Sequence, residues 1–210
     1  MAAERAFRIA VLASGGGTNL QAILDKLHGR EGVEVVGVGS NRRDAHALER
    51  AETAGVETAV FERDAYPDRA ARDSAIGDWL KGLEVDLVVL AGYMELLSEE
   101  FVGRFANRIV NVHPALLPSF PGLEAVQQAL DAGVKVTGVS VHFVDEGVDS
   151  GPIIVQRAVE VPDDREWDSL ETRIHAVEHE LLPQAIRLIA AGRVSFDPED
   201  PRLVRIAPAD

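Results

Sequence analysis

The chain has 210 residues, 46% of them hydrophobic, which is enough for one domain with a sizeable core. It contains no cysteine, which excludes disulfides, thiolate metal sites and a cysteine nucleophile. The formal net charge of −14 at pH 7 argues against a general nucleic-acid binder. No stretch has the ~20 apolar residues of a membrane helix, and no signal peptide is recognisable. We therefore expect a cytoplasmic protein without nucleic-acid or membrane partners.

The first half of the chain alternates short apolar runs with amphipathic stretches. Strands are expected at residues 7–13, 33–38, 57–61, 86–90 and 108–113, and helices at 19–28, 44–54, 66–83 and 98–105. Residues 86–90 (DLVVL) are apolar on both faces, which is typical of a parallel sheet covered by helices. The alternation predicts an α/β fold: a doubly wound, mostly parallel, Rossmann-like sheet with helices on both faces.

In the second half, a proline-rich segment at 114–122 precedes an expected helix at 122–132 and strands at 136–144 and 152–161. These closely spaced strands predict an antiparallel edge to the sheet. A long helix is expected at 165–190, with a kink at Pro183. We expect a single domain over residues 1–210. Its nucleotide-binding half covers about 7–120, its second half about 121–192, and a C-terminal surface extension 193–210.

A glycine loop, SGGGTN at residues 14–19, joins the first strand to the first helix. Glycines let backbone N–H groups approach a ligand, and the helix N-terminus adds partial positive charge, so the loop predicts an anion site. Thr18 and Asn19 could also cap the helix. The loop is not a Walker A motif, and Leu20 stands where a dinucleotide fingerprint has its third glycine. The alternative is a tight turn without a ligand.

Asn111 and His113 end an expected strand and, being two residues apart, point to the same face. The carboxyl ends of strands carry the ligand sites in open α/β sheets. An amide and a protonated imidazole can together stabilise an oxyanion, and the imidazole can also move protons. Such a histidine needs an orienting carboxylate. The following loop offers three, and the residues alone do not choose among Asp145, Glu146 and Asp149.

Four motifs in order and spacing, at residues 14–20, 90–98, 111–122 and 138–153, resemble the glycinamide ribonucleotide formyltransferases. The similarity covers about residues 7–192. It implies transfer of a formyl group from 10-formyltetrahydrofolate, a co-substrate, to the amine of phosphoribosylglycinamide in purine biosynthesis. It also implies small-molecule substrates, no metal, and a monomer or homodimer.

The resemblance assigns the catalytic roles. Asn111 would hold the formyl oxygen, His113 would be the general acid, and Asp149 would pair with His113. The ribonucleotide contacts that it implies are Gly16, Gly17, Thr18, Asn19, His175 and Glu178. The folate contacts that it implies are Arg69, Met94, Glu95, Leu96, Leu97, Asn111, Val144, Asp145 and Glu146. Arg63 and Arg72 lie close enough to Arg69 in the sequence to be alternatives to it.

One position departs from the family pattern. Many relatives have Met-Arg in the folate segment, where this chain has Met94-Glu95. A carboxylate cannot pair with the glutamate tail of a folate, whereas main-chain contacts to the pterin would preserve binding. The sequence predicts that Glu95→Arg would tighten binding of polyglutamylated folate more than binding of the monoglutamate.

Other readings of the sequence are weaker. Residues 175–179 (HAVEH) match an H-x-x-E-H zinc pattern, but no second motif supplies a third ligand. Formyltetrahydrofolate hydrolase and methionyl-tRNA formyltransferase share the same catalytic logic but usually carry an additional domain. A non-catalytic binding module does not need a titrating histidine. An NAD-dependent oxidoreductase is disfavoured by Leu20 and Asn41.

Overall fold

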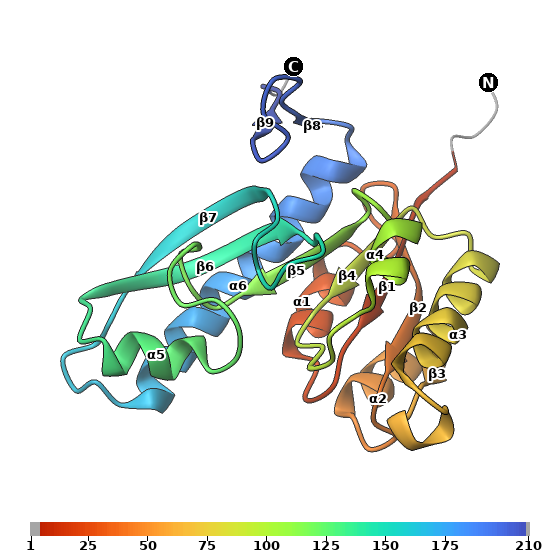
Figure 1. Cartoon of the computed structure of the whole chain (residues 1–210), viewed down its shortest axis with the longest axis horizontal. Helices are drawn as coiled ribbons and strands as arrows, with labels where there is room; N and C mark the ends of the chain where they lie inside the picture. Colours follow the sequence, from red (N-terminus) through yellow and green to blue (C-terminus); the bar gives the residue numbers. More distant parts are fainter. Residues whose placement is uncertain (1–4, 209–210) are drawn as a thin grey trace. The chain divides into compact units, whose positions relative to one another are not determined.

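The computed structural model describes residues 5–208, in two compact units that meet in the chain between Val110 and Asn111. Strands β1 to β7 are hydrogen-bonded in the order β3-β2-β1-β4-β5-β6-β7, and β5 runs from the end of one unit into the start of the other. Figure 1 shows the elements coloured along the chain. The mostly parallel α/β sheet with one antiparallel edge, expected from the sequence, is confirmed.

The first unit alternates strands and helices. They are β1 (Phe7–Leu12), α1 (Thr18–Lys26), β2 (Val33–Ser40), α2 (His46–Thr53), β3 (Thr58–Val60), a 3₁₀ turn (Arg63–Ala65), α3 (Arg69–Gly82), β4 (Leu87–Leu90) and α4 (Glu99–Arg104). The pairings β1–β2, β1–β4 and β2–β3 are all parallel. The strand order reverses at β1, so right-handed crossovers put α1 and α2 on one face and α3 on the other. The reversal makes the carboxyl ends of β1 and β4 the expected ligand crevice of this unit.

Local chemistry sets the ends of these helices. The Asp68 carboxylate accepts from the Ala71 N–H and caps α3, and the Ser98 hydroxyl accepts from the Phe101 N–H and caps α4. Helix α1 differs from the sequence expectation, because its N-cap is Gly17 and no side chain caps it. Gly17 adopts φ 69°, a left-handed conformation that favours glycine. The first N–H groups of α1 therefore donate no hydrogen bond to a capping side chain.

The second unit holds the end of β5 (Ile109–His113), then α5 (Ala125–Asp131), β6 (Val136–Phe143), β7 (Ile153–Glu160), α6 (Trp167–Ala190), β8 (Val194–Phe196) and β9 (Val204–Ile206). Strands β6 and β7 pair antiparallel, and α6 packs against both (Figure 1). The apolar stripe of α6 is buried, including Leu170, Ile174 and Leu181. Helix α6 continues without a break through Pro183. Among the helices of residues 5–208, none is long and apolar enough to cross a membrane.

The C-terminal tail is more ordered than expected. A surface extension was predicted from its prolines, but β8 and β9 form an antiparallel hairpin. Phe196 of β8 packs on Phe143 of β6, with ring centroids 4.9 Å apart. A three-residue strand is too short to show the two-residue periodicity from which strands are predicted, and its pairing depends on tertiary contacts.

Candidate active site

The glycine loop presents open backbone at the carboxyl end of β1. A Cβ atom added to Gly15 or Gly16 would meet no heavy atom within 4 Å, so the backbone on that side faces open space. A Cβ atom at Gly17 would lie 2.7 Å from the Cα atom of Ala47, so this residue is glycine for packing as well as for its φ angle. Thr18 is exposed and Asn19 is buried in the first turn of α1. This turn has the open backbone and the helix N-terminus of an anion site.

Residues of helix α2 donate hydrogen bonds to two carbonyl groups of the glycine loop. The Ala47 N–H donates to the Gly15 carbonyl at 3.1 Å, and Arg50 Nε donates to the Gly16 carbonyl at 2.8 Å. A second Arg50 nitrogen, Nη1, donates to Gln21 in α1 at 2.9 Å. These contacts fix the carbonyl groups of Gly15 and Gly16. No pattern in the sequence singles out Arg50, which lies 34 residues after Gly16.

The segment after β4, residues 91–98, adjoins the glycine loop. The Ser14 N–H donates to the Gly92 carbonyl at 3.0 Å, and the Met94 N–H donates to Ser14 Oγ at 2.8 Å. Met94 and Leu96 point outward, each 63% exposed, whereas Glu95 turns inward and pairs with Arg72. The structure therefore brings the residues expected to contact folate in this segment close to the glycine loop. Arg69, the first residue of α3, is exposed.

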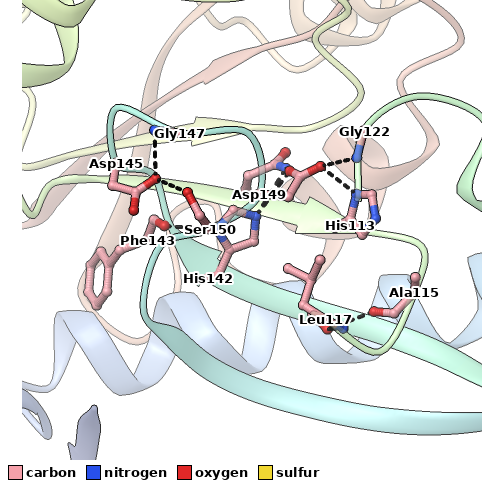
Figure 2. A network of polar contacts seen from close by, with 12 residues as sticks. His113, Ala115, Leu117, Gly122, His142, Phe143, Asp145, Gly147, Asp149 and Ser150 are labelled. Carbon is pink, nitrogen blue, oxygen red and sulfur yellow. Dashed lines mark hydrogen bonds and ion pairs between the residues drawn. The ribbon is translucent and has the colours of Figure 1, made fainter. Parts of the chain in front are cut away.

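In the second unit, one carboxylate holds both polar residues of the strand end. Asn111 Nδ2 donates to Asp149 Oδ1 at 3.2 Å, and His113 Nδ1 lies 3.2 Å from Asp149 Oδ2. The Gly122 N–H also donates to Oδ2, at 2.8 Å (Figure 2). Asp149 adopts φ 50°, which is uncommon for a residue other than glycine and turns its carboxylate toward β5. Of the three acids left open by the residues, Asp149 is the one in contact with His113.

Both ring nitrogens of His113 are engaged. Nδ1 faces Asp149, and Nε2 lies 2.8 Å from the Phe120 carbonyl oxygen. A carbonyl oxygen only accepts hydrogen bonds, so Nε2 carries the proton of this contact, and the carboxylate can accept a second one from Nδ1. The side chain is buried, with 5% of its surface exposed. His113 is thus oriented at both nitrogens, one of them by a backbone group that no sequence pattern reveals.

His142, at the end of β6, is a further member of this site that the sequence did not identify. Its Nδ1 donates to the Phe143 carbonyl at 2.8 Å. Its Nε2 lies 3.3 Å from Asn111 Nδ2 and 3.4 Å from Asp149 Oδ1. When neutral, Nε2 can accept from Asn111, and when protonated it can donate to Asp149. A histidine near the carboxyl end of a buried strand was the available signal.

Asp149 remains ionised in this setting. Burial raises the pKa of its carboxyl group, but hydrogen bonds from His142 and the Gly122 N–H, together with nearby His113, outweigh burial and leave that pKa below its usual value. A negative charge therefore lies beside the His113 ring. The site therefore combines the Asn111 amide donor, the oriented His113 ring and the negative charge of Asp149. These groups can together stabilise an oxyanion and move a proton.

The other predicted residues of this loop are placed differently. Asp145 Oδ1 accepts from the Gly147 N–H at 3.0 Å and from Ser150 Oγ at 2.8 Å, so Asp145 shapes the loop (Figure 2). Val144 is half-buried and Glu146 is exposed. Among the described residues, His113 is paired with Asp149 and not with Asp145 or Glu146.

Helix α6 brings together the late residues that the resemblance singled out. His175 Nε2 lies 4.0 Å from a Glu178 oxygen and 4.0 Å from a Glu171 oxygen, and the His175 ring stacks on His179 at 6.0 Å. Glu178 is buried at 5% exposure. Within residues 5–208, no group of three or more histidine, cysteine, aspartate or glutamate side chains is arranged to hold a metal ion.

Comparison with known proteins defines the class. A family model described as formyl transferase matches residues 7–186, so the chain belongs to this family of formyl-transferring enzymes. It is 43% identical over 188 residues to phosphoribosylglycinamide formyltransferase of Haemophilus influenzae, covering 89% of each chain. It is 44% identical over 202 residues to the trifunctional purine biosynthetic protein adenosine-3 of Drosophila melanogaster, covering 95% of this chain but 15% of that protein.

A solved structure agrees with the sequence relatives. The crystal structure of glycinamide ribonucleotide transformylase 1 from Symbiobacterium toebii matches with a TM-score of 0.92 and 51% identity, over 97% of this chain and 95% of that one. The fold class and the family are therefore established together.

Proposed function

We propose that this chain transfers the formyl group of 10-formyltetrahydrofolate to the amine of phosphoribosylglycinamide. The products are formylglycinamide ribonucleotide and tetrahydrofolate, and the step belongs to de novo purine biosynthesis. The names of the Haemophilus and Symbiobacterium relatives support the acceptor. The observation that carries the chemistry is the Asp149 carboxylate, which engages Asn111 and His113 at 3.2 Å each.

In the proposed reaction, the glycinamide amine attacks the formyl carbon of the donor and a C–N bond forms. The formyl oxygen becomes an oxyanion, which the Asn111 amide and the protonated His113 ring stabilise. The bond between the formyl carbon and N10 of the folate then breaks. A proton passes from the amine to N10, by way of His113 or a water molecule. No serine or cysteine nucleophile is involved, so the transfer is direct, and much of the rate comes from aligning two bound substrates.

His113 must change one contact to act in this way. Its Nε2 donates to the Phe120 carbonyl at 2.8 Å, and its Nδ1 faces Asp149. Nδ1 keeps the counter-charge throughout, so Nε2 is the nitrogen that meets the oxyanion. We expect the backbone around Phe120 to release Nε2 when the substrates bind. Phe120 has φ 55°, an uncommon conformation for a residue other than glycine.

The two substrates use different residues in the proposal. The phosphate of the ribonucleotide accepts hydrogen bonds from the N–H groups of Gly16, Gly17, Thr18 and Asn19. The glycinamide end of the ribonucleotide contacts His175 and Glu178. The folate contacts Arg69, the side chains of Met94, Leu96 and Leu97, and the loop at 144–146. A direct transfer requires no metal. A cytoplasmic location and a monomeric or homodimeric state remain predictions.

An absorbance assay of 10-formyltetrahydrofolate deformylation, with and without phosphoribosylglycinamide, tests the proposal. We expect turnover that depends on the ribonucleotide. Equal turnover without it would contradict the transfer and indicate a hydrolase. No turnover in either case, for a protein shown by calorimetry to be folded, would favour a binding module.

A further inference from the structure

A buried arginine lies in helix α3 of the first unit. The Arg72 side chain is 2% exposed, and its neighbour Asp73 is 1% exposed. Arg72 donates through Nη2 to Asp73 Oδ1 at 3.1 Å, and its Nη1 lies 2.9 Å from Glu95 Oε2. One guanidinium group thus lies between two carboxylates. A buried charge is retained only when paired, so this arrangement depends on all three side chains.

The Glu95 side chain points into the protein, whereas the side chains of its neighbours Met94 and Leu96 point outward. Its Oε1 accepts from Asn41 Nδ2 at 3.2 Å, and its Oε2 meets Arg72, so both oxygens are engaged. The Glu95 side chain is 26% exposed, whereas Met94 and Leu96 are each 63% exposed. Tyr93, on the inward side like Glu95, is buried. The alternation shows which side chains of this segment are available to a ligand.

The same cluster holds the segment at a second point. The Ser98 N–H donates to Asp73 Oδ2 at 2.7 Å, so Arg72 is linked to the segment through Glu95 directly and through Asp73 at its far end. The hydrogen bond from Arg72 lowers the pKa of Glu95, against an opposing effect of burial, so its charge is retained and is compensated within the cluster.

We propose that Arg72 and Glu95 are positioning residues, and that the ion pair between them fixes residues 93–98. Met94 and Leu96 then face the folate donor, and Glu95 does not contact the glutamate tail of the folate. For the folate, this rests on the proposed function. It replaces the sequence-based expectation that residue 95 lies at the glutamate tail and that Glu95→Arg would tighten polyglutamate binding. That expectation assumed an outward side chain, and Glu95 pairs inward with Arg72. For the same reason Glu95→Arg would place two cations together and would not tighten donor binding.

Steady-state kinetics of Glu95→Ala and Glu95→Gln test the proposal, with donors carrying one glutamate or several. We expect Glu95→Ala to raise the KM for the donor about tenfold, equally for both tail lengths, because losing the ion pair loosens the segment. kcat and the KM for the ribonucleotide should change by less than about twofold. Glu100→Ala, which removes an exposed carboxylate of α4, is the matched control and should behave as wild type.

Glu95→Gln should recover most of the donor KM. Its new amide oxygen can accept from Arg72. Its new N–H can donate to Asn41 once the Asn41 amide turns over to present Oδ1, which is buried and has no hydrogen-bond partner among the described residues. A donor KM in Glu95→Ala that falls more for the polyglutamate than for the monoglutamate would overturn the proposal, because it would mean that the carboxylate faces the tail. An unchanged donor KM in Glu95→Ala would also overturn it.

Hydrogen exchange on the protein alone separates this inference from the proposed function. We expect the Ser98 amide, which donates to Asp73, to exchange at least about tenfold faster in Glu95→Ala and in Arg72→Met than in Glu100→Ala. Equal protection in all three would overturn the positioning role whether or not folate is the donor. If wild type failed to use 10-formyltetrahydrofolate but the exchange difference appeared, the proposed donor would be wrong and the positioning role would stand.

Discussion

At the scale of single residues, Asp149 is the centre of the candidate active site. Its two oxygens engage Asn111, His113, His142 and the Gly122 N–H, so one carboxylate orients residues from β5, β6 and the segment after β5 (Figure 2). Losing it would remove the shared acceptor of the Asn111 amide, His113 Nδ1 and the Gly122 N–H, which is costly. The predictions for this residue therefore concern both turnover and stability.

We expect His113→Ala and Asp149→Ala to lower kcat about 10²–10⁴-fold, the range for loss of a general acid–base group. The KM values should change by only a few fold, because these groups act mainly in the transition state. Steady-state kinetics with both substrates checks this. Asp163→Ala, an exposed acid in the loop after β7, is the control. Wild-type-like kcat in either active-site variant would remove that residue from the mechanism.

The depressed pKa of Asp149 predicts a pH dependence of stability. A carboxyl group with a lower pKa in the folded state stabilises the fold above its unfolded pKa of about 3.9, and loses that contribution as the pH falls through the folded pKa. We expect Asp149→Asn to be about 1–3 kcal/mol less stable than wild type near pH 7, and this difference to shrink below about pH 4. Urea unfolding at a series of pH values measures it. A difference that grew in acid would contradict the assignment.

At the scale of elements, the carboxyl ends of β1 and β4 form a single hydrogen-bonded surface. The glycine loop after β1 is held by α2 through Ala47 and Arg50, and the segment after β4 is held to it through Ser14. These contacts fix the carbonyl groups of Gly15 and Gly16, and the backbone of both residues borders open space. The strand order reverses between these two strands, and in open α/β sheets ligands bind at such a point.

Gly17 is the residue on which this loop depends most. Gly17→Ala would put a Cβ atom 2.7 Å from the Ala47 Cα at φ 69°, so we expect a loss of about 2–4 kcal/mol in the free energy of unfolding. In the folded fraction the KM for the ribonucleotide should rise. Gly15→Ala is the stability control, since its Cβ atom would meet nothing within 4 Å. Equal stability of the two variants, measured by thermal unfolding, would be inconsistent with this packing.

At the scale of the whole molecule, the sequence predicted what depends on local periodicity. The alternation of β and α elements, the glycine loop and the facing pair Asn111 and His113 could all be read from spacing. Contacts between residues far apart in the chain could not. The sequence did not reveal that His142 adjoins Asp149, that Arg50 braces Gly16, or that Glu95 pairs inward with Arg72. The C-terminal hairpin was missed because its strands are too short to be periodic.

The central claim is direct formyl transfer to the glycinamide amine, and following the formyl carbon tests it. Donor labelled with carbon-13 in its formyl group would be incubated with phosphoribosylglycinamide and the enzyme, and the products separated by mass spectrometry. We predict that the label appears in formylglycinamide ribonucleotide with wild type, and at a strongly reduced rate with His113→Ala and Asp149→Ala. Label released as formate, with none in the ribonucleotide, would contradict the account.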